Sequence, residues 1–231
     1  MSKGRYLFSA ISGVLLNLVL MLLPSILSGV QQSVLSDPRL ITFLLIISFW
    51  VILAAGDSDR EIIIPGQQRQ ARWLPYLMSA AMLSVFLTSL TERALNEVTP
   101  LTILAIAGGV TMLVGILLRR LAIRRLGAYF LDDVVIASGQ ELVTAGIYSR
   151  VRHPSETGNL CIAFGCPLLL GSPIGLVVST LILLPVVLIR IRLEDRLLMQ
   201  HYLGLFSAYS RDVPALFGIR LLIFWDKSNF Q

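Results

Sequence analysis

The chain contains 231 residues, of which 55% are hydrophobic and only 14% are charged, and its net charge is +5. A fraction of 14% charged residues is too low to cover a water-soluble core of that size. The composition therefore indicates an integral membrane protein. The same hydrophobicity excludes a disordered chain, and a total of two cysteines excludes a disulfide-rich scaffold.

Uncharged segments in the N-terminal half predict four membrane-spanning helices. They comprise residues 6–30, 40–55, 74–90 and a segment within 98–118. The first follows a short basic start, as in a signal peptide, but it is longer than a signal core, so we interpret it as a retained helix. Each segment is continuously apolar, which favours helices over the alternating strands of a barrel. Their residues alone predict membrane packing and no chemistry.

A fifth apolar stretch, residues 157–189, is interrupted in its middle by the sequence Gly-Ser-Pro-Ile-Gly at residues 171–175. Glycine and proline in this arrangement predict a hairpin of two helices. Each arm is shorter than the roughly 20 residues that cross a bilayer upright. The hairpin therefore either lies shallow in the membrane or continues through its second arm beyond the membrane surface. We expect an all-α membrane protein with about six transmembrane helices.

The basic residues are distributed unevenly across this topology. Among the 19 lysines and arginines, only Arg39 and Arg93 fall on the side opposite to the termini. Because lysine and arginine gather on the cytoplasmic side, we expect both termini and the polar segments 119–157 and 190–231 in the cytoplasm. The positive charge is thus a signal of topology, and we expect no nucleic acid as a partner.

Two charged residues after the hairpin have a spacing of interest. Arg190 and Glu194 are four residues apart, so they lie on one face of a helix. The planar guanidinium of an arginine suits a carboxylate, and a glutamate accepts hydroxyl or cationic groups, so the pair could hold two ligands next to each other. The alternative is an ion pair at the membrane surface without a ligand.

Other reactive residue types have structural interpretations. His153 precedes a proline, and the other histidine of the chain, His201, is distant in sequence, so we expect no metal site. Cys161 and Cys166 lie within an apolar run and are predicted to pack in the interior. Gly108-Gly109 lies within a predicted span and is typical of close helix packing.

Several ordered motifs occur between residues 119 and 217. In chain order they are Gly127 with Tyr129-Phe130, Leu142-Val143, Gly146-x-Tyr148, Arg152-His153-Pro154-x-x-x-Gly158, the interrupted hairpin, Arg190, Glu194-Asp195, Tyr209 and Val213-Pro214. In these motifs the chain resembles the isoprenylcysteine carboxyl methyltransferases and phospholipid methyltransferases, a group of integral membrane enzymes. The resemblance covers a little under half of the protein, and the combination is more specific than any single motif.

The resemblance implies an organisation and an activity. It divides the chain into four N-terminal transmembrane helices, residues 1–118, and a methyltransferase catalytic region, residues 119–231, with a cytoplasmic connector, the hairpin and a cytoplasmic tail. It implies S-adenosylmethionine as the cofactor, bound at the cytoplasmic ends of the C-terminal helices. The acceptor it implies is a lipid-like or prenylated molecule from the bilayer, admitted past the hairpin and methylated on a carboxylate, as in isoprenylcysteine carboxyl methylation.

The resemblance also implies roles for individual residues. Arg190 corresponds to the substrate-orienting arginine of the family and is the candidate catalytic residue. Glu156 stands where the family usually has tyrosine, and its carboxylate is able to accept hydrogen bonds from ribose hydroxyls. The residues that correspond to cofactor contacts are Gln140, Glu141, Leu142, Val143, Tyr148, His153, Pro154, Ser155, Glu156 and Glu194.

Two other functions remain open on the sequence. A phospholipid or lipid-amine N-methyltransferase is one, because the N-terminal helices that would surround the acceptor contain no recognisable motif. A non-catalytic membrane protein on the same scaffold is the other, and Glu156 in place of tyrosine is the feature that favours it.

Overall fold

The computed structural model describes residues 37–55, 71, 73–96, 101–130, 136 and 139–217. The predicted first span, residues 6–30, lies outside these residues. The secondary-structure elements of the described chain are all helical, which confirms the expected fold class. The main helices are α2 (Pro38–Ala55), α3 (Leu74–Leu95), α4 (Ile103–Leu126), α5 (Pro154–Leu170), α6 (Pro173–Val178) and α7 (Leu184–Asp212), with short elements η3 (Gly127–Tyr129), η4 (Gly146–Ser149) and η5 (Ser179–Leu183).

Three of the described helical segments are long and apolar enough to cross a membrane. They are α3, α4 and the continuous helical segment Pro173–Asp212, which joins α6, η5 and α7. The apolar part of α2, Pro38–Leu53, is shorter. Helices therefore occupy the predicted segments within the described chain, three of them long and apolar enough to span a membrane, and the total of six spans stays a prediction.

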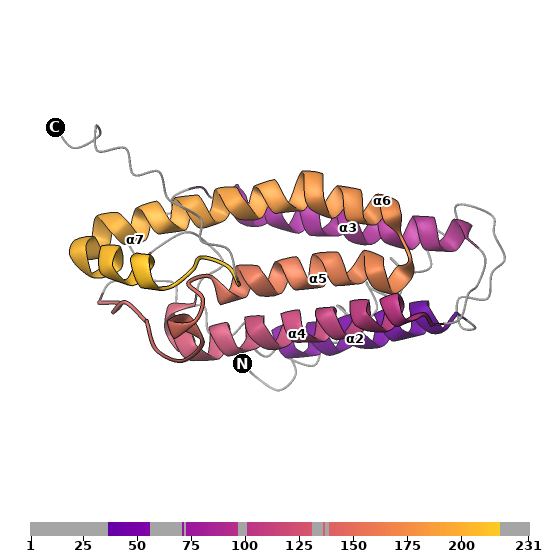
Figure 1. Cartoon of the computed structure of the whole chain (residues 1–231), viewed down its shortest axis with the longest axis horizontal. Helices are drawn as coiled ribbons and strands as arrows, with labels where there is room; N and C mark the ends of the chain where they lie inside the picture. The colour runs from indigo at the N-terminus through magenta and orange to yellow at the C-terminus, as the bar shows by residue number, and fades with distance from the viewer. Residues whose placement is uncertain are drawn as a thin grey trace.

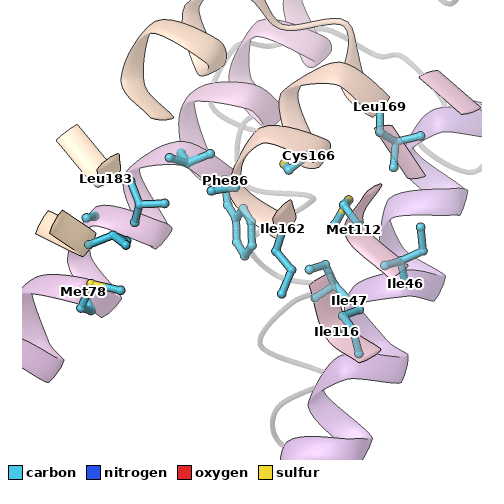
Figure 2. Packing of buried hydrophobic residues seen from close by; sticks show 14 of the residues in the cluster. Ile46, Ile47, Met78, Phe86, Met112, Ile116, Ile162, Cys166, Leu169 and Leu183 are labelled. Atoms are coloured by element: carbon cyan, nitrogen blue, oxygen red, sulfur yellow. The ribbon is translucent and has the colours of Figure 1, made fainter. Parts of the chain in front are cut away.

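The helices run roughly along the long axis of the molecule, with α5 in the middle (Figure 1). On one side α5 packs against α3, and on the other it packs most extensively against α4, next to α2. Figure 2 shows the core around α5, whose Ile162 and Cys166 lie between Phe86 of α3 and Met112 of α4. The predicted interior position of Cys166 is confirmed.

Glycines allow α4 and α5 to approach closely. A Cβ atom on Gly108 would lie 2.4 Å from the backbone nitrogen of Leu169, and one on Gly115 would lie 2.5 Å from the carbonyl oxygen of Gly158. Gly165 of α5 faces Gly108 in the same way. Small residues at such positions let two membrane helices pack backbone against backbone. This packing fixes the start of α5 relative to the end of α4.

The hairpin turn forms as predicted, between Leu170 and Pro173. Gly171 adopts a left-handed conformation with φ of 71°, which glycine accommodates without strain. Ser172 then caps α6 by accepting a hydrogen bond from the backbone N–H of Gly175, and a carboxylate oxygen of Glu92 accepts a hydrogen bond from the backbone N–H of Ile174. The helix of the second arm continues to Asp212 and is longer than the roughly 20 residues that cross a bilayer upright.

A sharp bend reverses the chain near the end of α7 (Figure 1). Leu203 has φ of 42° and ψ of −117°, a conformation outside the helical region, and helical structure resumes after it. The segment after α7 returns along the start of α5, where Pro214 and Ala215 accept hydrogen bonds from the backbone N–H groups of Arg152 and His153. The end of α7 therefore closes over the connector that precedes α5.

Candidate active site

The connector between α4 and α5, the first turn of α5 and the middle of α7 enclose a cavity at one end of the bundle. The cavity contains about 900 Å³ of unfilled space, part of it open to solvent, which is within the range of small-molecule sites. Every site residue predicted from the sequence lies in its wall: Gln140, Glu141, Leu142, Val143, Tyr148, His153, Pro154, Ser155, Glu156, Arg190 and Glu194. The structure thus brings together two blocks whose residues are 34 to 54 positions apart in sequence.

Tyrosines of α7 hold the connector in place. The hydroxyl group of Tyr202 donates to the carbonyl oxygen of Gln140 at 2.7 Å, and that of Tyr209 donates to the carbonyl oxygen of Tyr148 at 2.6 Å. The motif residue Tyr209 therefore shapes the cavity through a backbone contact. Burial, and then the nearby Glu194, raise the pKa of Tyr148 well above its ordinary value, so its phenol stays neutral.

Aromatic rings supply much of the remaining wall. Tyr129, Phe130, Tyr148, Tyr202 and Phe206 all border the cavity. Flat rings of this kind offer stacking surfaces to a heterocyclic base and attract a cation to their faces.

Charges of alternating sign lie at and behind the wall of the cavity. The Nε2 atom of His153 lies 2.8 Å from Oδ1 of Asp195, and its Nδ1 atom lies 3.4 Å from Oε2 of Glu194. Oδ2 of Asp195 lies 3.2 Å from Nη1 of Arg152. The side chains of Arg152, His153 and Asp195 are almost fully buried, whereas 39% of the Glu194 side chain is exposed, which leaves this carboxylate accessible within the cavity.

The two carboxylates keep His153 protonated. Burial alone would lower its pKa, but the charge of Glu194 and the hydrogen bonds to Asp195 and Glu194 outweigh burial and raise the pKa to about 10. The imidazolium therefore donates to both acids at neutral pH. Asp195, which the sequence indicated only as part of an acidic pair, fixes this histidine.

A second ion pair lies in the wall of the same cavity. The Nε atom of Arg190 is 2.9 Å from Oε1 of Glu156, and both side chains are buried. The amide nitrogen of Asn159 donates to Oε2 of Glu156 at 3.1 Å. Both oxygens of this carboxylate thus have protein partners, whereas the sequence suggested only that Glu156 could accept hydrogen bonds from a ribose.

A second cavity begins at this ion pair. Its unfilled space, part of it open, is about 960 Å³. Arg190 and Glu156 line both cavities. The remaining wall of the second cavity comprises Trp50 of α2, six residues of α3 (Pro75, Met78, Ser79, Met82, Leu83 and Phe86), Arg119 and Asn159.

The sequence did not locate this apolar cavity. The N-terminal helices were expected to surround the acceptor without a recognisable motif, and α3 provides most of the apolar wall. Apolar residues that line a cavity have the same pattern as those that face lipid, so periodicity could not separate them. Arg119, whose Nη1 donates to Ser155 at 2.7 Å, was also missed as a cavity residue.

The two cavities define the class of protein. One is polar, aromatic and open to solvent, and the other is apolar and lies among helices apolar enough to cross a membrane. Such an arrangement belongs to an integral membrane protein with two adjoining cavities of different polarity.

Comparisons with known proteins agree with this class. A sequence model of the isoprenylcysteine carboxyl methyltransferase family matches residues 107–200. A probable protein-S-isoprenylcysteine O-methyltransferase of Oryza sativa subsp. indica is 30% identical over 165 residues, which cover 70% of this chain and 84% of the rice protein. The protein-S-isoprenylcysteine O-methyltransferase of Schizosaccharomyces pombe is 32% identical over 111 residues, 42% of this chain and 46% of the yeast protein.

A solved structure has the same fold. The eukaryotic intramembrane Ras methyltransferase, an isoprenylcysteine carboxyl methyltransferase, superposes with a TM-score of 0.58 at 20% identity, covering 90% of this chain and 74% of that one. The chain belongs to the isoprenylcysteine carboxyl methyltransferase family and is a methyltransferase.

Proposed function

We propose that the protein transfers a methyl group from S-adenosylmethionine to the carboxylate of a lipid-modified acceptor that it takes from the bilayer. The observation that supports this most strongly is the meeting of a polar and an apolar cavity at Arg190. A methyltransferase of this family needs a water-soluble donor and an amphiphilic acceptor to meet at one point, and Arg190 lies at that point.

The residues of the polar cavity fit S-adenosylmethionine. Its aromatic rings suit the adenine and the positively charged sulfonium, and the accessible carboxylate of Glu194 suits the cationic or hydroxyl groups. His153 holds Glu194 in place while its own charge is balanced by Asp195. We assign cofactor binding to the connector residues 140–143, to Tyr148, to the segment 153–156 and to Glu194. This cavity draws its wall from residues after 119, which supports assigning residues 119–231 to the catalytic region.

The apolar cavity fits the chain of a lipid-like acceptor. Met78, Met82 and Phe86 offer an apolar surface along one face of α3, and Arg190 stands at its polar end. An arginine binds a carboxylate through two parallel hydrogen bonds and so fixes its orientation. We assign to Arg190 the task of holding the acceptor carboxylate towards the polar cavity.

The reaction requires alignment more than acid–base chemistry. S-adenosylmethionine, when bound, would supply an activated methyl group for transfer to the acceptor carboxylate, with S-adenosylhomocysteine as the leaving product. The acceptor carboxylate is already ionised, so no residue needs to remove a proton. The contributions of this chain are to position the two ligands and to exclude water between them. The bias of basic residues supports a position of the polar cavity on the cytoplasmic side of the membrane.

The test is methyl transfer by the purified full-length protein in detergent or lipid. With radiolabelled S-adenosylmethionine and a farnesylated cysteine acid as the acceptor, we expect label that alkali releases, because a methyl ester is base-labile. Label in phosphatidylethanolamine that resists alkali would assign N-methylation instead. The absence of label from both acceptors and from a total lipid extract would reject an enzymatic function.

A further inference from the structure

A turn of π-helix, η5, interrupts the long helical segment that runs from α6 into α7 (Figure 1). The backbone N–H of Leu184 donates to the carbonyl oxygen of Ser179, five residues earlier, whereas an N–H in an α-helix donates to the fourth residue before it. Such a turn contains one residue more than a turn of α-helix, so it changes the direction in which all later side chains point. Arg190 and Glu194 are among these later side chains.

Two prolines favour this turn and its attachment to α5. Pro185 is the second residue of α7, and in a regular α-helix its ring would clash with the carbonyl group of Leu181. The wider π turn relieves that clash. In α5, Pro167 has no N–H to donate to the carbonyl oxygen of Ala163, and the hydroxyl group of Ser179 lies 2.8 Å from this oxygen. The turn is thereby joined to the helix in the middle of the bundle.

The burial of the segment shows what the extra residue does. Buried side chains or backbone positions recur at every fourth residue, at Gly175, Ser179, Leu183, Val187, Ile191 and Asp195. In a regular α-helix four residues exceed one turn by about 40°, so this series would drift about 200° around the helix over its five steps. The extra residue of η5 compensates about 100° of that drift. It therefore keeps α6 and α7 both packed against α3 and α5.

The positions of Arg190 and Glu194 depend on this rotation. Nε of Arg190 lies 2.9 Å from Oε1 of Glu156, and Oε2 of Glu194 lies 3.4 Å from Nδ1 of His153, so both side chains point towards the start of α5. Without the extra residue the two side chains would turn by about 100° relative to the hairpin. Arg190 would then leave the wall of both cavities, and Glu194 would leave the polar one.

We propose that η5 is a positioning element of the active site, whose extra residue sets the rotation of α7 so that Arg190 and Glu194 face their ligands. The residues of η5 line neither cavity, so the element acts through α7. The expected effect on turnover rests on the proposed roles of Arg190 and Glu194. The expected effect on geometry does not, because it concerns only which side of α7 faces α5.

The experiment changes the number of residues in the turn and leaves every cavity residue in place. Deletion of Ile182, whose side chain is 46% exposed, removes the extra residue. Ile182→Ala keeps the number and is the matched control. A compensated variant combines the deletion with one alanine inserted after Leu184. This variant restores the number and again places a leucine at the buried position of Leu183.

Two functional measurements are made on the full-length protein. We expect the deletion to lower kcat/KM for methyl transfer to a farnesylated cysteine acid by about 100-fold or more, because the two ligands are no longer aligned. Calorimetric titration should show S-adenosylmethionine binding weakened by about tenfold or more, because Glu194 has turned away. Ile182→Ala should keep both values, and the compensated variant should recover most of both.

A crosslink measures the rotation directly and needs no activity. Cysteines are placed at positions 156 and 190, with Cys161 and Cys166 replaced by alanine. A short dimaleimide should join the two introduced cysteines in the chain of normal length and in the compensated variant, but not in the deletion variant. Mass spectrometry of the digested protein detects the crosslinked peptides.

Thermal unfolding shows which variants are folded. If the deletion variant does not fold, the variant with the alanine insertion alone takes its place, since it turns α7 in the opposite sense and should also lose activity and crosslink. If neither folds, an experimental structure of the wild-type protein decides. A regular α-helix over residues 179–183 with Arg190 still on Glu156 would overturn the inference, and a π turn there would support it.

A folded deletion variant that keeps its activity and its crosslink would overturn the inference, as would a folded compensated variant that recovers neither. Both results leave carboxyl methylation intact. A wild-type protein that neither binds S-adenosylmethionine nor methylates the acceptor would count against the proposed function, and the crosslinks would then test the rotation alone.

Discussion

The Nε atom of Arg190 lies 2.9 Å from Oε1 of Glu156, and this pair separates a polar cavity from an apolar one. One helical turn further along α7, Glu194 faces the polar cavity and contacts His153. Of these two opposite charges on one face of α7, Arg190 lines both cavities, whereas Glu194 lines the polar one. This division of roles between Arg190 and Glu194 leads to the first prediction.

Removing Arg190 and removing Glu194 should have different effects. Arg190→Ala should lower kcat/KM for methyl transfer by about 10²- to 10³-fold, a loss typical of an oriented donor in an active site, and change cofactor affinity little. Glu194→Ala should weaken cofactor binding by about tenfold to a hundredfold, since it removes a charge-assisted contact. Calorimetric titration of S-adenosylmethionine into both variants checks this, and equal losses of affinity would refute the assignment.

The close contact between α4 and α5 predicts a contrast between two adjacent glycines. In Gly108→Ala the new methyl group would lie 2.4 Å from the backbone nitrogen of Leu169, so the helices must separate, at a cost of about 1–3 kcal/mol. In Gly109→Ala the nearest atom is the end of the Ile46 side chain at 3.6 Å, so stability should be kept. Thermal unfolding in detergent measures both variants, and equal midpoints would contradict the packing.

The protonation of His153 predicts a decline in stability at alkaline pH. Its pKa is about 10 in the folded protein against 6.5 for the free side chain. The stabilisation is therefore complete below about pH 6.5, decreases as the pH rises from there, and is lost above about pH 10. His153→Gln should flatten this dependence, and His201→Gln, at an exposed position, should not. Unfolding midpoints from pH 6 to pH 10 that fall equally in the two variants would contradict it.

The apolar cavity predicts a dependence on acceptor chain length. Met82→Trp fills part of the cavity, so kcat/KM should fall more for a geranylgeranyl acceptor than for a geranyl one, with cofactor affinity unchanged. Leu77→Trp is the control, since Leu77 is exposed on the same helix and does not line the cavity. A loss that is the same for every chain length, or that Leu77→Trp reproduces, would place the lipid chain elsewhere.

Much of the fold and of the polar cavity could be predicted from the sequence because their signals are local. Continuous apolar runs gave the helices α2, α3 and α4, and Gly171 with Pro173 gave the hairpin. The ordered motifs predicted residues that line the polar cavity, because these residues lie on two short segments that α5 and α7 bring together.

The structural features that the sequence did not predict depend on contacts between distant segments. The pairing of Arg190 with Glu156 joins two helices, and neither residue indicates the other in the sequence. The bend at Leu203 could not be predicted from the sequence either, because leucine rarely adopts a positive φ. The apolar cavity along α3 has no polar residue pattern to mark it.

The most direct test of the central claim is an experimental structure with S-adenosylhomocysteine and S-farnesylcysteine bound together. We predict the nucleoside between Tyr148 and Glu194, the farnesyl chain along Met78 and Phe86, and the acceptor carboxylate on Arg190. A nucleoside outside the polar cavity, or a farnesyl chain on another face of the bundle with Arg190 still paired to Glu156, would contradict the claim that the two ligands meet at Arg190.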